Sequence, residues 1–198
     1  MKTALKVVGT ALVVIVAVFG VWRYRQWKLA QRAGIISENI EHDGDVWNAD
    51  FLARVPAPEE KVFDAIKDVE GSHSSMIKAV RVVSSTANTK RVEMDMTAMG
   101  GQTQTVTFDF TYDPVAHRIS YKSVGNPQIQ TDAEYILEDQ GATTLIRLRQ
   151  TTAMPAGVPL PDGVVKEVIR GIFVAQMDAL QNALHIKSSG DADSGDDD

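Results

Sequence analysis

The side chains that can do acid–base or metal chemistry are scattered along this chain of 198 residues. The four histidines, His42, His73, His117 and His185, fall in expected connectors, turns or a helix end, and no two have the spacing of metal ligands. Cysteine is absent, which excludes a disulfide framework and a thiolate metal site. The sequence also lacks a glycine-rich phosphate loop and a nucleophile elbow. It therefore predicts no catalytic residue, no metal site and no cofactor.

The side chains that could instead bind an apolar ligand alternate with polar ones along a series of expected strands. Methionines adapt to irregular apolar shapes, and a tyrosine hydroxyl on an apolar face can hold the polar end of a ligand. The same residues also suit an ordinary packed core, and both interpretations stay open. The candidate ligand-binding residues are Met94, Met96, Phe108, Phe110, Tyr112, Tyr121, Tyr135, Ile146, Leu148, Gln150, Ile169 and Phe173.

The elements that must position these residues begin where the spacing of apolar residues changes, within "FLARVPAPEEKVFDAIKDVEG", residues 51–71. Alternation of large and polar residues from Trp47 to Val55 predicts a strand. Pro56 ends that strand, and Pro58 suits the first turn of a helix. The inner stripe of this helix is Val62, Phe63, Ile66 and Val69.

Six further strands and a long helix are expected after this helix. Turn residues separate the strands at regular spacing, which favours an antiparallel meander with one wet and one apolar face. The face assignment is ambiguous for the first of the six, around Val80. Gly171 inside the last helix either allows close approach to the sheet or leaves room for a ligand. The expected ranges are 77–85, 90–99, 102–112, 118–124, 129–138 and 143–152 for the strands and 162–186 for the helix.

This order of elements resembles the helix-grip fold of the START and birch-pollen-allergen superfamily, often called SRPBCC, over about residues 45–187. The best local match is "APEEKVFDAIKDVE". The resemblance implies an α+β fold in which a curved seven-stranded antiparallel sheet wraps the last helix around an apolar cavity, with the first strand at an edge. It also implies that His73, in "GSHSSM", could lie at the cavity mouth; a solvated loop residue is the alternative. The superfamily includes lipid and sterol carriers, polyketide cyclases, coenzyme Q-binding proteins and chaperone activators.

The first 32 residues predict a membrane anchor with a basic flank. Residues 7–22, "VVGTALVVIVAVFGVW", are uncharged, and residues 3–22 are long enough to span a bilayer. A cleaved signal peptide is the alternative, but bulky aromatics stand where cleavage needs small residues. The arginines and lysine that follow the span favour a cytoplasmic domain, with an extracytoplasmic one as the alternative. Residues 33–44, "AGIISENIEHDG", are expected to be a polar linker.

Charge is unevenly distributed along the chain. Residues 1–32 carry six Lys or Arg and no acidic residue, whereas 188–198 carry five Asp and no basic residue and are expected to be a disordered tail. The segment between them is net acidic. Such a domain repels phosphate backbones, which argues against a nucleic-acid partner. A protein partner could bind the acidic face or the tail.

The sequence and the resemblance together favour a single-pass, membrane-anchored module that binds a hydrophobic ligand of the lipid, quinone or isoprenoid class between the sheet and the last helix. Two alternatives stay open. One is a protein-interaction module with a closed core. The other is a cyclase- or aromatase-type enzyme in which Tyr121, Tyr135, Gln150 or His73 positions a polyketide-like substrate.

Overall fold

The computed structural model describes residues 34–71, 77–97, 102–125, 130–154 and 161–185. Within these ranges no helix has both the length and the apolar character needed to cross a bilayer. The predicted anchor at residues 3–22, His73 and the acidic tail at 188–198 lie outside the described residues, so these assignments remain predictions.

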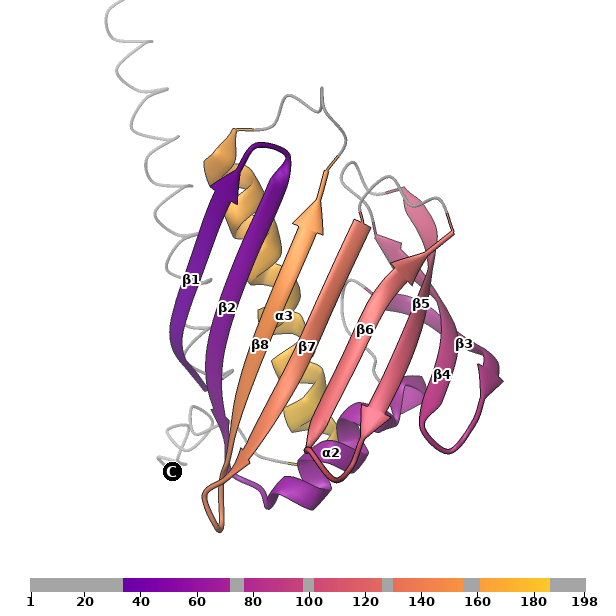
Figure 1. Ribbon diagram of the computed structural model, residues 1–198, viewed down its shortest axis with the longest axis vertical. Coiled ribbons are helices and arrows are strands. Elements are labelled where there is room, and N and C mark those ends of the chain that lie inside the picture. Colours follow the sequence, from indigo (N-terminus) through magenta and orange to yellow (C-terminus); the bar gives the residue numbers. More distant parts are fainter. Residues whose placement is uncertain (1–33, 72–76, 98–101, 126–129, 155–160, 186–198) are drawn as a thin grey trace, which may run out of the picture.

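The described chain forms one curved antiparallel sheet of eight strands with helices on one face (Figure 1). The strands occur in the sheet in the order β1-β2-β8-β7-β6-β5-β4-β3. Their bounds are β1 Ile35–Asp43, β2 Val46–Val55, β3 Ile77–Ser85, β4 Thr89–Thr97, β5 Thr103–Asp113, β6 Arg118–Val124, β7 Gln130–Asp139 and β8 Thr144–Ala153. The helices are α2 Glu59–Lys67, the short 3-10 helix η1 Val69–Gly71 and α3 Asp162–Ala183. This is the predicted helix-grip α+β fold.

The prediction of seven strands is wrong, because the expected linker at 33–44 contains an eighth strand, β1. This strand pairs with β2 from Ile35 to Asp43, and Gly44 supplies the positive φ of the tight turn between them. Most β1 side chains are exposed, since β1 is an edge strand. Its polar composition therefore resembles that of a connector, although its backbone completes the sheet. The strand predicted to lie at the edge, β2, is instead paired on both sides, with β1 and β8.

The predicted break between strand and helix at the Pro-Ala-Pro segment is confirmed. Strand β2 ends at Val55, and α2 begins at Glu59, directly after Pro58. The fully buried Thr144 donates a hydrogen bond from Oγ1 to the Ala57 carbonyl at 2.7 Å, which fastens the break to β8. The buried Glu59 carboxylate contacts Nδ1 of His117 in the β5–β6 turn. These contacts hold α2 against one end of the sheet.

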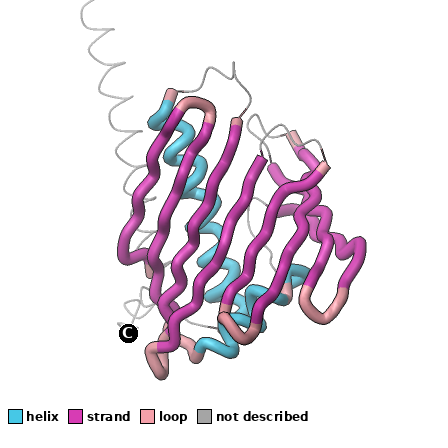
Figure 2. The backbone as a smooth tube through the Cα atoms, viewed as in Figure 1, coloured by secondary structure: helices cyan, strands magenta, loops and turns pink. Residues whose placement is uncertain are grey.

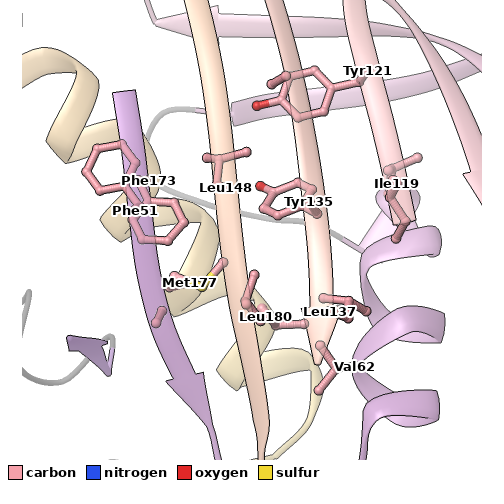
Figure 3. Close-up of a cluster of buried hydrophobic side chains, with 14 of the residues drawn as sticks. Phe51, Val62, Ile119, Tyr121, Tyr135, Leu137, Leu148, Phe173, Met177 and Leu180 are labelled. Carbon is pink, nitrogen blue, oxygen red and sulfur yellow. The ribbon is translucent and has the colours of Figure 1, made fainter. Parts of the chain in front are cut away.

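The two faces of the sheet divide as the alternation predicts. On the inner face, Phe51 of β2 stacks on Phe173 of α3 with ring centroids 4.4 Å apart (Figure 3). On the outer face, side chains pair across strands; for example, Arg91 bonds to Asp109 at 2.6 Å and 2.8 Å. The ambiguity around Val80 has a structural cause, because β3 contains register shifts on both sides of that residue.

The long helix α3 runs obliquely across the inner face of the sheet, and α2 lies near one end of it (Figure 2). An ion pair between Arg170 and Glu38 of β1 joins α3 to the edge strand. Within the helix, Arg170 also bonds to Glu167. The N-terminal half of α3 thus lies against β1. Its C-terminal half extends towards α2, and there the inner face is less completely filled.

Candidate functional site

An apolar cavity of about 150 Å³ lies between the inner face of the sheet, α2 with η1, and the C-terminal half of α3. Side chains from both helices and from strands β3 to β8 line it. The lining residues are Ala65, Ile66, Val69, Ile77, Met94, Met96, Phe108, Phe110, Tyr121, Thr131, Tyr135, Gln150, Ile172, Ala175, Gln176, Met177, Ala179, Leu180 and Ala183.

The position of the cavity follows from side-chain size along α3. Near the middle of the helix, Phe173 fills the space against the sheet by stacking on Phe51. Further along, Ala175, Ala179 and Ala183 recur at four-residue spacing and all line the cavity. Small side chains at these positions leave volume that the facing strands do not fill.

A chain of three polar side chains interrupts the apolar lining. The Tyr135 hydroxyl of β7 donates to Oε1 of Gln176 on α3 at 2.9 Å. Nε2 of Gln176 then donates to the Tyr121 hydroxyl of β6 at 3.5 Å. Figure 3 shows the two tyrosines on neighbouring strands with their hydroxyl oxygens directed to the same side, towards β8. The polar groups are therefore gathered at one place on the cavity wall.

Burial keeps both tyrosines protonated. Desolvation raises the pKa of Tyr135 well above its usual value, and the neighbouring Tyr121 raises it further. Desolvation also raises the pKa of Tyr121, although hydrogen bonds with Gln176 and with Tyr135 oppose that shift. Both side chains are consequently neutral phenols at physiological pH, able to donate a hydrogen bond.

Gln150 of β8 adds a second polar group to the lining. Its Nε2 donates to Oγ1 of Thr152 at 2.8 Å, which fixes the orientation of the amide. Among the described lining residues none has an ionisable carboxylate, imidazole or amine. The described part of the chain likewise contains no group of three acidic or histidine side chains that could hold a metal ion. The lining can bind through apolar contact and neutral hydrogen bonds.

The structure brings most of the predicted ligand-binding residues together around the cavity. Seven line it: Met94, Met96, Phe108, Phe110, Tyr121, Tyr135 and Gln150. The other five are buried elsewhere in the core: Tyr112, Ile146, Leu148, Ile169 and Phe173. Ile169 and Phe173 are buried on α3 but do not line the cavity. The alternation correctly places all the strand residues on the inner face, but not all of that face borders the cavity.

Tyr112 differs from the other two tyrosines in its surroundings. Its hydroxyl is buried with no hydrogen-bond partner among the described residues. The ammonium group of Lys67 lies 5.7 Å from the centre of its ring. Tyr112 does not line the cavity, so a substitution of Tyr112 can serve as a control for substitutions of Tyr121 and Tyr135.

The candidate ligand-binding residues from the sequence do not include any of the residues of α2 and α3 that line the cavity. Helical spacing predicts that Ile66 and Val69 face inwards, but the candidate set does not include them. Gln176 is likewise inward-facing by helical spacing, yet nothing local places it opposite Tyr135, which is 41 residues earlier. The alanine spacing at 175, 179 and 183 is the signal in the sequence that could have indicated the cavity.

In a comparison with protein families, the model described as "Polyketide cyclase / dehydrase and lipid transport" matches residues 51–185. A comparison with curated proteins finds no match.

Solved structures share the fold at low sequence identity. The Zhui aromatase/cyclase from Streptomyces sp. R1128 has a TM-score of 0.63 and 20% identity, covering 73% of this chain and 98% of that one. A STAR-related lipid transfer protein from Xanthomonas axonopodis has a TM-score of 0.57 and 13% identity, covering 77% and 99%. A START superfamily protein from Mycobacterium smegmatis has a TM-score of 0.53 and 16% identity, covering 69% and 93%.

Proposed function

Because the chain belongs to the polyketide cyclase / dehydrase and lipid transport family, we propose that it binds a hydrophobic small molecule in the cavity between its sheet and α3. The observation that carries the proposal is the cavity itself. Apolar side chains make up most of its wall, and the few polar groups converge on one place, as is typical of ligand sites.

The size of the cavity sets a limit on how the ligand binds. Sites for drug-sized ligands usually measure about 300–1,000 Å³, whereas an engineered cavity of about 150 Å³ holds benzene. The cavity described here, at about 150 Å³, accommodates a ring or a short chain segment. A lipid, quinone or isoprenoid would therefore insert one end, or α2 and α3 would separate to admit more of it.

The proposed anchor at residues 3–22 would give this binding module its location. The uncharged run supports a single-pass attachment that keeps the cavity near a source of membrane lipids, and the basic flank favours a cytoplasmic domain. Of the two other hypotheses, an enzyme would need an acid–base pair, which the described lining does not provide. An interaction module with a closed core does not account for the cavity.

Native mass spectrometry of the full-length chain, purified from its host and followed by lipid extraction, tests the proposal. We expect a discrete bound mass. Ala179→Leu should remove it, because the larger side chain fills part of the cavity; Ala116→Leu, the same change at an exposed turn position, should not. An empty wild-type protein that takes up no fatty acid, quinone or isoprenoid alcohol would overturn the proposal.

A further inference from the structure

Two tyrosines and a glutamine in the cavity wall form a closed set of hydrogen bonds, the polar triad Tyr121, Tyr135 and Gln176. The Tyr135 hydroxyl donates to Oε1 of Gln176 at 2.9 Å, and Nε2 of Gln176 donates to the Tyr121 hydroxyl at 3.5 Å. A third hydrogen bond joins the two tyrosine hydroxyls, whose ring centroids lie 6.0 Å apart. Because the single Tyr135 proton is directed to Gln176, the proton in this third bond comes from Tyr121. Each hydroxyl of the triad therefore donates one hydrogen bond and accepts another.

The buried polar groups of the lining are thus already bonded within the protein. The two buried side-chain atoms that lack a hydrogen-bond partner in the described chain belong to Glu59 and Tyr112, and neither residue lines the cavity. Gln150 donates to Thr152 at 2.8 Å. Thr131, the remaining polar residue of the lining, is only partly buried. A polar atom that entered the cavity would lose its hydrogen bonds with water and meet a wall whose hydroxyls are occupied.

Hydrocarbon makes up the rest of the wall around the triad. The Tyr121 ring centroid lies 5.8 Å from that of Phe108 in an edge-on contact and 5.3 Å from that of Phe110 in a stacked one. These contacts leave the Tyr121 hydroxyl little freedom to turn towards a different partner. From α3, the alanines at 175, 179 and 183 line the cavity with methyl groups. Burial of apolar surface is therefore the main interaction that this wall offers a ligand.

We infer that the cavity receives a hydrocarbon end of its ligand, a ring or a chain segment without polar atoms, while the ligand's polar group stays outside. The inference rests on the proposed function and narrows it. An acyl chain or an isoprenoid tail meets this requirement, and a quinone would enter by its tail rather than by its carbonyl-bearing ring. The polar triad then acts against polar ends, because a carbonyl that enters must give up water without gaining a free donor.

The test compares two small probes of nearly the same shape, acetophenone and α-methylstyrene, in which a methylene group replaces the carbonyl oxygen. Their affinities are measured by calorimetry on the full-length chain in nanodiscs, with empty nanodiscs as the blank. We expect the affinity of acetophenone relative to α-methylstyrene to be no higher than the ratio of their partition coefficients from water into hexadecane, a solvent that forms no hydrogen bonds. A hydrogen bond from the wall would raise the relative affinity of acetophenone about tenfold above this ratio.

Opening the polar triad provides the matched variant. Tyr121→Phe removes the acceptor of the Gln176 amide nitrogen, so that an N–H group becomes free to bind a carbonyl oxygen. We expect this variant to shift the preference about tenfold towards acetophenone. Tyr112→Phe, outside the lining, should leave the wild-type preference unchanged.

A second measurement on the wild-type chain needs no variant. The infrared stretch of carbonyl-labelled acetophenone in the cavity should keep the frequency that it has in hexadecane. A shift to lower frequency, a wild-type preference for acetophenone above the hexadecane ratio, or a Tyr121→Phe variant with the wild-type preference would overturn the inference while leaving the proposed function intact. Binding of a lipid by a protein that takes up neither probe would do the same. If neither probe and no lipid binds, the proposed function itself fails.

Discussion

The Tyr135 hydroxyl donates a 2.9 Å hydrogen bond to Oε1 of Gln176 and thereby joins β7 to the C-terminal half of α3. This bond links the sheet to the helix across the edge of the cavity. It also orients the amide that faces Tyr121. One contact therefore bears on both the stability of the fold and the chemistry of the site.

Two buried tyrosines, Tyr135 and Tyr112, allow a comparison of how their hydroxyl groups affect the free energy of unfolding. Tyr135→Phe leaves the partly buried Gln176 oxygen without its donor, so we expect the free energy of unfolding to fall by about 1 kcal/mol. Tyr112→Phe removes a buried hydroxyl that has no partner in the described chain and should be neutral or stabilising. Urea unfolding of both variants measures the difference. A loss for Tyr112→Phe as large as that for Tyr135→Phe would contradict this assignment.

The Pro-Ala-Pro break depends on Thr144. Thr144→Val keeps the shape but leaves the Ala57 carbonyl unsatisfied, so we expect a loss of about 1–3 kcal/mol in unfolding free energy. Thr144→Ser, which retains the hydroxyl, should lose less. The two variants are compared by chemical denaturation; a larger loss for Thr144→Ser than for Thr144→Val would mean that packing of the methyl group, rather than the hydrogen bond, is what matters here.

Two glycines should respond to alanine in opposite directions. At Gly171 an added Cβ meets nothing within 4 Å, so close approach of helix to sheet does not require glycine there. Gly171→Ala should stabilise the protein by up to about 1 kcal/mol through helix propensity. At Gly34, φ is +71° and a Cβ would lie 2.3 Å from the Arg54 carbonyl oxygen. Gly34→Ala should therefore be destabilising, and thermal unfolding of the pair checks the contrast.

Attachment of β1 depends on Arg170. The guanidinium binds Glu38 of β1 and Glu167, and the hydrogen bond to Glu38 holds the pKa of Arg170 above its usual value. Arg170→Met should therefore speed amide hydrogen exchange in Ile35–Asp43, with little change in β7. Lys166→Met, an exposed neighbour on the same helix, is the control. Unchanged exchange in β1 would show that its pairing with β2 is sufficient.

Acid should weaken the outer face of the sheet. Hydrogen bonds from Arg147 and Arg91 hold the pKa values of Asp50 and Asp109 below the ordinary value for aspartate. These carboxylates therefore stabilise the fold above the unfolded pKa of about 3.9, and the contribution is lost as the pH falls through the lower folded values.

Urea unfolding at a series of pH values between 6 and 2 measures this loss. Asp50→Asn should be less stable than wild type at pH 6, and the gap should narrow as the pH falls. A gap that stays constant across the range would show that Asp50 does not contribute through its charge.

Much of the fold is predictable because its signals are local. Alternation along β5 places Phe108, Phe110 and Tyr112 on one face whatever else the chain does, since successive side chains of a strand point to opposite sides. Pro56 and Pro58 likewise mark the break between strand and helix through their own backbone restrictions. The edge strand β1 escapes prediction because hydrogen bonding to β2 stabilises it without an apolar face of its own.

The sequence by itself determined which side chains face inwards, because strand and helix periods operate over a few neighbouring residues. Only the tertiary structure decided which of them share a cavity. That cavity is the volume left when α2, α3 and the curved sheet pack together, and it depends on the sizes of side chains far apart in the chain. Tyr135 and Gln176 meet for the same reason: long-range packing sets their separation, and no local pattern records it.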